Sequence, residues 1–84
     1  MTKVKIYIRE TCPFCVKALE LIKKFKNLEL ETISIQGRDD IRAQMIEETG
    51  EATVPQIFIN DTYIPAGCSG LYSLYDAGKL DEYL

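Results

Sequence analysis

The sequence predicts an α/β fold in which four strands and three helices follow one another in the order β-α-β-α-β-β-α. Two observations support this prediction. Segments typical of strands alternate along the chain with segments in which apolar residues recur every three or four positions, as they do in helices. No linker, repeat or low-complexity stretch interrupts the alternation, so we expect residues 1–84 to form a single domain.

The first half of the chain predicts a strand, a helix and a second strand. Val4, Ile6 and Ile8 alternate with Lys5 and Tyr7, which predicts a strand over residues 3–8. A helix is expected to run to about residue 26, because one apolar stripe is formed by Cys15, Ala18, Leu19, Ile22 and Phe25. Residues 28–35 are rich in apolar and β-branched side chains and predict a second strand, parallel to the first across a right-handed connection.

A second helix and a hairpin are expected next. Residues 36–39 suit a turn and a helix cap, and the helix begins at about Asp40 and ends at Gly50. Its buried face is expected to carry Ile41, Met45 and Ile46. Strands over residues 56–59 and 62–65 flank the two-residue turn Asn60-Asp61. The parallel pair and this antiparallel hairpin together predict a four-stranded mixed sheet.

The last helix is expected to start at Ser69, whose hydroxyl suits an N-cap, and to end near Gly78. Its apolar residues are Leu71, Leu74 and Tyr75.

The composition excludes several classes of protein. Apolar residues make up 46% and charged residues 27% of the chain, which is the balance of a folded domain and not of a disordered one. The net charge is −3 and the basic cluster at Lys23, Lys24 and Lys26 is small, so nucleic-acid binding is not expected. The sequence has no apolar leader and no run of about 20 apolar residues, which predicts a cytoplasmic protein without a membrane segment. No exposed apolar patch is expected, and the chain should be a monomer.

Cys12-Pro13-Phe14-Cys15 lies between the first strand and the first helix. Pro13 suits the first turn of a helix, where its missing N–H would have had no partner. Unpaired N–H groups and the dipole at a helix start favour a thiolate, so we expect the pKa of Cys12 to fall from about 8.5 into the range of roughly 3.5 to 7.5. Because the two sulfurs lie on one helix face, they can form a disulfide, with Cys12 as the exposed nucleophile and Cys15 as the resolving thiol.

Three other interpretations of these cysteines stay open. A structural zinc site needs four ligands, whereas the chain has one further cysteine, Cys68, and no histidine, so no metal is expected. A purely structural disulfide would close so short a loop that it would stabilise the fold weakly. Two buried and inert thiols are the third interpretation, and the position of the pair between a strand and a helix favours redox activity over it.

Three segments together resemble the glutaredoxin family. Residues 7–15 are similar to its strand and active site, Thr53-Val54-Pro55 to its Thr-Val-Pro loop, and Ala66-Gly67-Cys68-Ser69 to its Gly-Gly-Cys-Ser loop. The order and separation of the three segments match along essentially the whole chain. The resemblance implies a thioredoxin-like fold and a glutathione-dependent thiol-disulfide oxidoreductase.

The same resemblance implies a glutathione site around Cys12. Pro55 would follow a cis peptide bond, so that the backbone of Val54 pairs with the cysteine of glutathione. Ser69 and the N–H groups at the start of the last helix would hold the γ-glutamyl carboxylate, and Arg9 or Arg42 would pair with the glycine carboxylate. The implied binding residues are Arg9, Phe14, Arg42, Thr53, Val54, Pro55, Gly67, Cys68 and Ser69. A proline that only begins an edge strand and a helix arginine that is only solvated are the competing interpretations.

Several positions depart from the family pattern or admit two interpretations. Phe14 replaces a usual tyrosine and keeps an apolar wall beside Cys12 without the hydroxyl. Ala66 replaces a glycine, which suggests a backbone conformation that tolerates a Cβ atom. Gly70 stands where an aspartate is frequent, which predicts weaker binding of glutathione through its α-amino group. Cys68 is either a small residue packed at the junction of loop and helix or an oxidation-sensitive third thiol.

The implied reaction is thiol-disulfide exchange with glutathione as reducing co-substrate and no bound cofactor. Cys12 alone suffices for glutathione mixed disulfides, whereas protein disulfides need both Cys12 and Cys15. The implied partners are glutathionylated or disulfide-containing proteins, for example ribonucleotide reductase. One alternative is a thioredoxin-like donor served by a flavoprotein reductase, which the absence of tryptophan disfavours. Another is an iron-sulfur carrier that uses Cys12 and glutathione as ligands, which the presence of Pro13 and Cys15 disfavours.

Overall fold

A computed structural model describes residues 2–84 of the chain and confirms the predicted α/β order of elements. The strands are β1 (Thr2–Ile8), β2 (Leu28–Ser34), β3 (Gln56–Ile59) and β4 (Thr62–Ile64). The helices are α1 (Pro13–Ile22), α2 (Asp39–Thr49) and α3 (Gly67–Asp76), followed by a short 3₁₀ turn, η1 (Leu80–Glu82). None of the helices in residues 2–84 has both the length and the hydropathy needed to span a bilayer.

The four strands form one mixed sheet in the order β2-β1-β3-β4. β1 pairs with β2 in parallel from Thr2 opposite Leu28 to Ile8 opposite Ser34, and with β3 in the antiparallel sense. The hairpin of β3 and β4 turns at Asn60 and Asp61, both in the left-handed backbone region that tight hairpin turns require. The predicted mixed sheet and hairpin are therefore confirmed.

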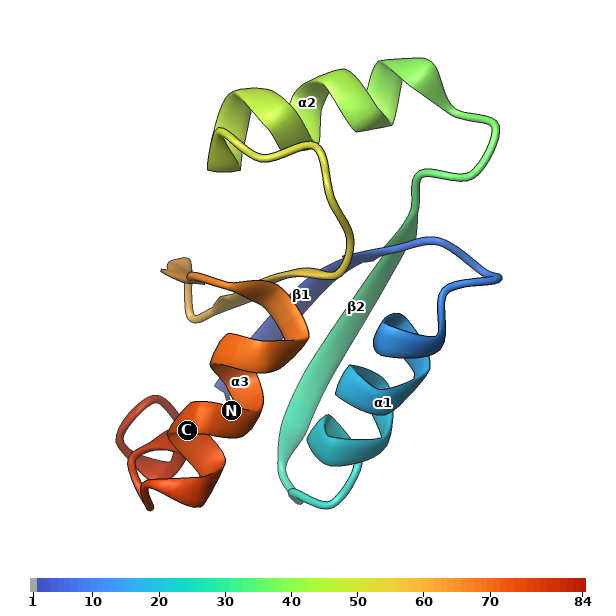
Figure 1. Cartoon of the computed structure of the whole chain (residues 1–84). Helices are drawn as coiled ribbons and strands as arrows, with labels where there is room; N and C mark the ends of the chain where they lie inside the picture. Colours follow the sequence, from blue (N-terminus) through green and yellow to red (C-terminus); the bar gives the residue numbers. More distant parts are fainter. Residues whose placement is uncertain (1) are drawn as a thin grey trace.

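The helices cover both faces of the sheet, with α2 on one side and α1 and α3 together on the other (Figure 1). Each face buries its own apolar cluster. Because successive side chains of a strand point to opposite faces, Ile6 of β1 belongs to the cluster under α1 and α3, and the next residue, Tyr7, to the cluster under α2. Ile57 and Leu71 are fully buried members of the first cluster, and Met45 of α2 is buried in the second.

Helix α1 is shorter than predicted. It ends at Ile22, and the chain then tightens into turns in which the N–H groups of Lys24 and Phe25 donate to carbonyls three residues back. Phe25 still packs against the core, but from a turn, and the backbone of Asn27 is left-handed. The apolar stripe thus continues beyond the helix, and the prediction of a helix to residue 26 is wrong for this reason.

Helix α3 begins before the predicted N-cap. Its first residue is Gly67 and its cap residue is Ala66, so Ser69 lies inside the first turn and not at the cap. Ala66 has φ +67°, in the left-handed region that is unfavourable for any residue with a Cβ atom. The expectation of a conformation that tolerates a side chain at Ala66 is therefore wrong, and this turn stores strain of about 1 kcal/mol.

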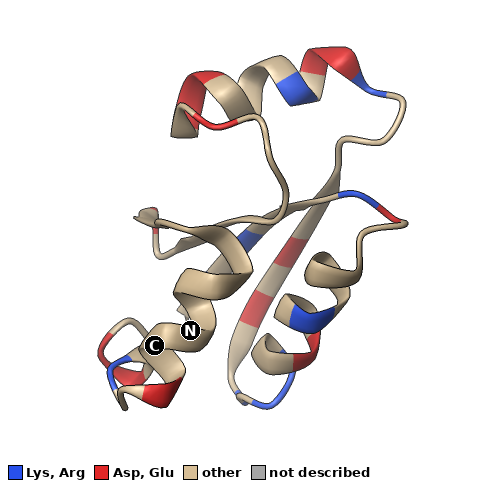
Figure 2. Ribbon diagram, viewed as in Figure 1, with Lys and Arg blue, Asp and Glu red and all other residues tan. Residues whose placement is uncertain are grey.

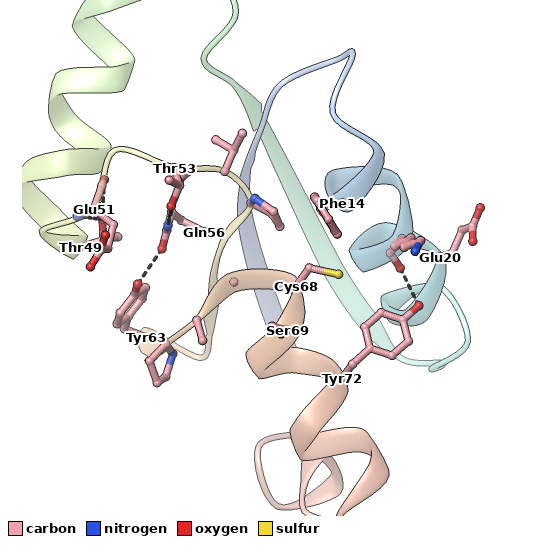
Figure 3. Close-up of a pocket in the computed structure, with 16 residues that line it drawn as sticks. Phe14, Glu20, Thr49, Glu51, Thr53, Gln56, Tyr63, Cys68, Ser69 and Tyr72 are labelled. Carbon is pink, nitrogen blue, oxygen red and sulfur yellow. Dashed lines mark hydrogen bonds between the residues drawn. The ribbon is translucent and has the colours of Figure 1, made fainter.

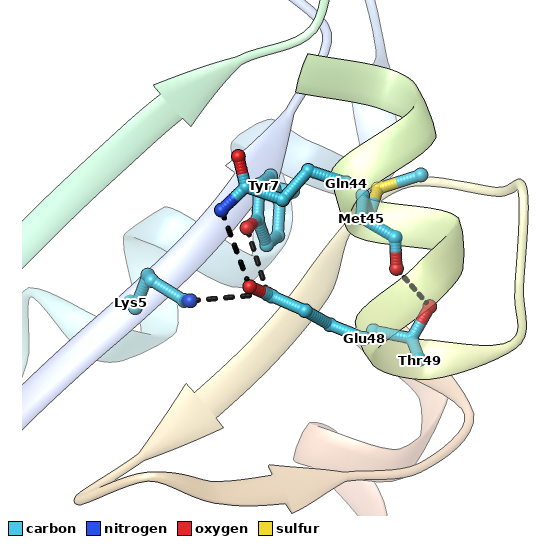
Figure 4. Close-up of polar contacts among 6 residues, drawn as sticks. All are labelled: Lys5, Tyr7, Gln44, Met45, Glu48 and Thr49. Carbon is cyan, nitrogen blue, oxygen red and sulfur yellow. Dashed lines mark hydrogen bonds and ion pairs between the residues drawn. The ribbon is translucent and has the colours of Figure 1, made fainter. Parts of the chain in front are cut away.

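Besides its apolar contacts, helix α2 is joined to the sheet through the carboxylate of Glu48. Glu48 accepts hydrogen bonds from the Tyr7 hydroxyl at 2.8 Å and from the Lys5 ammonium at 3.1 Å, both on β1 (Figure 4). Gln44, one turn earlier on the same helix, also donates to Glu48. At its other end α2 stops at Gly50 as predicted, with φ +75° and its N–H on the carbonyl of Ile46.

Candidate active site

Cys12 is placed by the end of β1 and the start of α1. The strand delivers a short loop whose turn closes when the N–H of Cys12 donates to the carbonyl of Arg9 at 3.1 Å. Cys12 is the N-cap residue of α1 and Pro13 occupies the first turn, as predicted. Both thiols are free: Cys12 is half-buried at the helix start, and Cys15, one turn further, is buried.

The pKa of the Cys12 thiol is lowered. Partial burial alone would raise it, but hydrogen bonds from the backbone N–H and the thiol of Cys15 and from the N–H of Phe14 outweigh that effect. The positive charge of Arg9 lowers it further. The donors are the unpaired groups of the first helical turn, so the predicted direction of the shift is confirmed with its predicted cause.

Cys15 behaves in the opposite way. Burial raises the pKa of its thiol to about 11, and the neighbouring Cys12 adds to the rise, although the N–H of Arg9 lies 3.5 Å from the sulfur and favours the thiolate. At neutral pH Cys15 is therefore a thiol and Cys12 is the better nucleophile.

The loop before β3 lies against the nucleophile. The bond between Val54 and Pro55 is cis, as the resemblance to glutaredoxins implies, and the carbonyl oxygen of Val54 lies 4.0 Å from the sulfur of Cys12. On its other side the loop touches the start of α3, where a Cβ atom on Gly67 would lie 2.7 Å from the carbonyl oxygen of Pro55. Glycine at position 67 thus allows the loop and α3 to approach closely.

A cavity of about 940 Å³ lies between this loop, α1 and α3 (Figure 3). Cys12 is not one of its lining residues, but Val54, whose carbonyl lies 4.0 Å from the Cys12 sulfur, is. The cavity walls include seven of the predicted binding residues, which are Phe14, Thr53, Val54, Pro55, Gly67, Cys68 and Ser69. Residues 52–55 of the loop and residues 67–75 of α3 carry no charged side chain (Figure 2). The charged groups on the cavity wall are Lys17, Glu20 and Glu51.

The two predicted arginines do not line this cavity. Arg9 is exposed in the loop before Cys12, and Arg42 is half-buried on α2. Within residues 2–84 neither guanidinium forms an ion pair. Arg9 is close enough to act on Cys12 through its charge, whereas no contact of Arg42 connects it with the site.

The comparisons with known proteins agree with this geometry. The family model described as Glutaredoxin matches residues 4–64. The chain belongs to the glutaredoxin family.

Individual relatives extend the match to the whole chain of this glutaredoxin. Glutaredoxin 3 of Escherichia coli is 42% identical over 84 residues, which cover 100% of this chain and 99% of that protein. The solution structure of glutaredoxin from Brucella melitensis has a TM-score of 0.82 and 42% identity, covering 100% of this chain and 89% of that one. The crystal structure of a buckwheat glutaredoxin-glutathione complex has a TM-score of 0.85 and 26% identity, covering 99% of this chain and 76% of that one. The fold is thioredoxin-like, and the protein is a thiol-disulfide oxidoreductase.

Cys68 of this glutaredoxin is buried near the other two thiols. Its pKa is raised, because burial and the charge of Cys12 outweigh the attraction of Lys17. Cys68 belongs to the core cluster under α1 and α3, which favours the packing interpretation over a reactive third thiol. Within residues 2–84, no three side chains of cysteine, aspartate or glutamate are grouped so as to hold a metal ion.

Gly70 is required by the backbone around it. A Cβ atom at this position would overlap the carbonyl oxygen of Pro65, which lies against the first turn of α3. An aspartate therefore cannot occupy position 70 unless the Pro65-Ala66 turn moves. Ala66 and Gly70, the two departures from the family pattern, thus belong to the same turn at the start of α3.

Several residues of the cavity wall were not predicted from the sequence. Lys17 and Tyr72 each lie three residues after a predicted site residue on the same helix, a spacing that puts them on the same face and that could have identified them. The hydroxyl of Tyr72 donates to the carbonyl of Lys17 at 3.1 Å and joins α3 to α1. Gln56 was also missed, although a polar side chain in an otherwise apolar strand is a signal.

Proposed function

We propose that this glutaredoxin reduces glutathione mixed disulfides and protein disulfides, with glutathione as the reducing co-substrate. The observation that supports the proposal most directly is the placement of Cys12. Its thiol, with a lowered pKa, faces the backbone of Val54 at the edge of a cavity that also contains the start of α3. A thiolate beside an exposed backbone segment suits a substrate that is both a disulfide and a peptide.

The proposed binding mode uses the backbone as well as side chains. The N–H and C=O of Val54 would pair with the cysteine of glutathione as an added strand would. Ser69 and the N–H groups of the first turn of α3 would bind the γ-glutamyl carboxylate, and Phe14, which is 60% exposed, would form an apolar wall. Arg9 would pair with the glycine carboxylate. The buckwheat relative, which contains glutathione, supports a site of this kind in the family.

Two parts of this mode are weaker. Gly70 supplies no carboxylate for the α-amino group of glutathione, so we expect lower affinity than in a relative with an aspartate there. Arg42 lacks contact with the cavity, and its role at the glycine end would require its long side chain to reach around the loop.

The proposed reaction with a glutathione mixed disulfide needs Cys12 only. The Cys12 thiolate attacks the glutathione sulfur, the new sulfur-sulfur bond forms as the old one breaks, and the substrate thiolate leaves and takes up a proton. A second glutathione thiolate then attacks the Cys12 mixed disulfide, which releases oxidised glutathione and restores the Cys12 thiolate.

A protein disulfide needs both cysteines in the proposed cycle. Cys12 forms a mixed disulfide with the substrate, and Cys15 loses its proton and displaces the second substrate thiol, leaving a Cys12-Cys15 disulfide. Two glutathione molecules return this disulfide to the dithiol and become oxidised glutathione. Proteins with accessible disulfides, for which ribonucleotide reductase serves as an example, form the proposed class of partner.

The test is turnover of a glutathione mixed disulfide by wild type, Cys12→Ser and Cys15→Ser, with glutathione, glutathione reductase and NADPH. We expect an active wild type, an inactive Cys12→Ser and an active Cys15→Ser, which loses activity only on protein disulfides. An inactive wild type that accepts electrons from thioredoxin reductase would instead favour the thioredoxin-like donor and refute the glutathione site.

A further inference from the structure

Gln56 is a polar side chain in a place where the fold buries apolar ones. It is the first residue of β3, follows Pro55 directly, and is 2% exposed. Of the polar and charged residues among residues 2–84, Gln56 is the one that is buried. A buried carboxamide lowers stability unless its donors and acceptors are paired, so a position like this needs a reason beyond packing.

The carboxamide of Gln56 connects two segments through three hydrogen bonds (Figure 3). Its Nε2 donates to the carbonyl oxygen of Thr53 at 2.8 Å and to the hydroxyl of Thr53 at 3.1 Å. Its Oε1 accepts from the hydroxyl of Tyr63 on β4 at 2.6 Å. The orientation of the amide is fixed, because the carbonyl of Thr53 can only accept and must therefore face the NH₂ group.

These bonds hold the loop that faces the nucleophile. Residues 51–55 have no regular secondary structure, and Gln56 supplies both of the hydrogen bonds that Thr53 makes within residues 2–84. The next residue is Val54, whose carbonyl lies 4.0 Å from the Cys12 sulfur. Fixing the carbonyl of Thr53 fixes the plane of the peptide that carries the N–H of Val54.

We infer that Gln56 is a positioning residue for substrate disulfides. Its polar atoms are bonded to Thr53 and Tyr63 and not to the reacting sulfur, and it acts by holding Thr53 so that the N–H and C=O of Val54 point along the edge where a peptide substrate pairs. The inference rests on the proposed function, since it concerns the pairing of a peptide-like disulfide with Val54. Tyr63 supports Gln56 from β4, and its ring is held in turn against Phe58 at 5.4 Å between centroids.

The experiment compares two disulfides in single-turnover reactions with the reduced protein. Glutathione disulfide offers peptide groups that can pair with Val54, whereas hydroxyethyl disulfide offers none. Gln56→Met keeps the shape of the side chain but loses its hydrogen bonds. We expect the rate with glutathione disulfide to fall about tenfold, which is the effect of losing the net free energy of one to two hydrogen bonds. The rate with hydroxyethyl disulfide should stay within about twofold of wild type, because attack by Cys12 itself is unchanged.

Two further variants complete the design. Gln44→Met makes the same substitution on the exposed side of α2 and should leave both rates at the wild-type value. Tyr63→Phe removes only the bond to Oε1 and should slow glutathione disulfide alone, by about two- to threefold. This variant carries the test if Gln56→Met does not fold, which the urea unfolding midpoint of each protein reveals.

The outcomes separate the inference from the function on which it rests. A wild type that reacts no faster with glutathione disulfide than with hydroxyethyl disulfide refutes the proposed function and the inference together. A wild type with that preference, combined with variants that retain it, refutes only the positioning role. Equal slowing of both disulfides by Gln56→Met or Tyr63→Phe also refutes it, because a general structural role would affect both reactions alike.

Discussion

Cys12 and Cys15 are chemically identical, but their surroundings change their pKa values in opposite directions. Cys12 lies where the first turn of α1 directs its unpaired N–H groups, whereas Cys15 is 1% exposed beneath that turn. The pKa of Cys12 is therefore lowered and that of Cys15 is raised to about 11. Cys12 is therefore the thiol that loses its proton more readily and attacks first, and Cys15 keeps its proton to a higher pH.

This contrast predicts selective alkylation. Iodoacetamide should modify Cys12 with a rate that rises with pH through a midpoint below about 8.5, the ordinary value for a cysteine. Cys15 should stay unmodified until the pH approaches 11. Arg9→Ala should move the Cys12 midpoint upward, because it removes a positive charge that favours the thiolate. Mass spectrometry of the cysteine peptides over a pH series measures all three effects.

The matched control is Lys26→Ala, which removes an equal charge from the exposed turn after α1 and should leave the midpoint unchanged. A Cys12 midpoint at or above that of a free cysteine would contradict the assignment of Cys12 as the nucleophile.

At the scale of elements, Glu48 provides the polar contact between α2 and the sheet, beside the apolar contact of the buried Met45. Burial opposes the ionised form of Glu48, but hydrogen bonds from Tyr7, Lys5 and Gln44 lower its pKa. The pKa of Lys5 is raised: burial works against the charge, and the hydrogen bond and charge of Glu48 outweigh burial. The ammonium of Lys5 also lies over the ring of Phe58 at 4.7 Å, which ties the cluster to β3.

Glu48→Gln should lower the free energy of unfolding by about 1 kcal/mol at pH 7, mostly because the charge-assisted hydrogen bond from the buried Tyr7 becomes one between neutral groups. The ion pair with Lys5 contributes little, because its side chains are 31% and 32% exposed. The lowered pKa of Glu48 means that its contribution is present above its unfolded value of about 4.3 and is lost as the pH falls through the folded value. The raised pKa of Lys5 means that its contribution is present below about 10.4 and is lost above the folded value. Urea unfolding of both proteins should therefore differ between about pH 5 and 9, and the difference should shrink as the pH falls through the lowered, folded pKa of Glu48.

Asp40→Asn provides the comparison for that measurement. Asp40 pairs with Arg38, the N-cap residue of α2, but both side chains are mostly exposed, so no measurable change is expected. A difference between wild type and Glu48→Gln that persists undiminished at pH 3 would show that Glu48 acts by some means other than its charge.

The ends of elements were harder to predict than the elements themselves. The strands and hairpin follow from alternation and turn residues, and Gly50 ends α2 as expected. The predicted end of α1 was too late, because Phe25 was counted in the helical apolar stripe. A residue that packs on the core from a turn produces the same apolar spacing in the sequence as one that packs from a helix. The predicted start of α3 at Ser69 was also too late. The helix begins after Ala66, whose backbone is left-handed, and no side chain caps it.

Across the whole molecule, α3 serves the core and the site at once. Its first turn contributes Gly67, Cys68 and Ser69 to the cavity, and Leu71 is fully buried against the sheet. Leu71→Ala should lower the free energy of unfolding by about 2 to 5 kcal/mol, a large part of the roughly 5 to 15 kcal/mol typical of a domain. Urea unfolding measures the loss. Ser73→Ala, exposed on the same helix, should change it by less than about 0.5 kcal/mol, and an equally small effect at Leu71 would contradict its place in the core.

The sequence could predict the parts of the site that are local in the chain. The spacing of Cys12 and Cys15 predicted their place at the start of a helix, and the resemblance of Thr53-Val54-Pro55 to a short family motif implied the cis bond before Pro55. The bond between Gln56 and Tyr63 depends on the pairing of Phe58 with Tyr63 in the hairpin and on two side-chain conformations. The close approach of the Pro65 carbonyl to Gly70, which leaves no room for a side chain there, depends on how the turn before α3 lies against the helix. Such features arise from register and close approach, which spacing along the chain does not specify.

Thr2 and Leu84 lie side by side, joined by a hydrogen bond of 3.3 Å from the hydroxyl of Thr2 to the carbonyl of Leu84 (Figure 1). β1 runs from Thr2 toward the loop that leads to Cys12, and its seven residues separate the two places by roughly 20 Å. A tether attached at either residue would therefore anchor the molecule to a bead or an electrode with its reactive sulfur facing the solution. Immobilised protein should then exchange disulfides as readily as free protein.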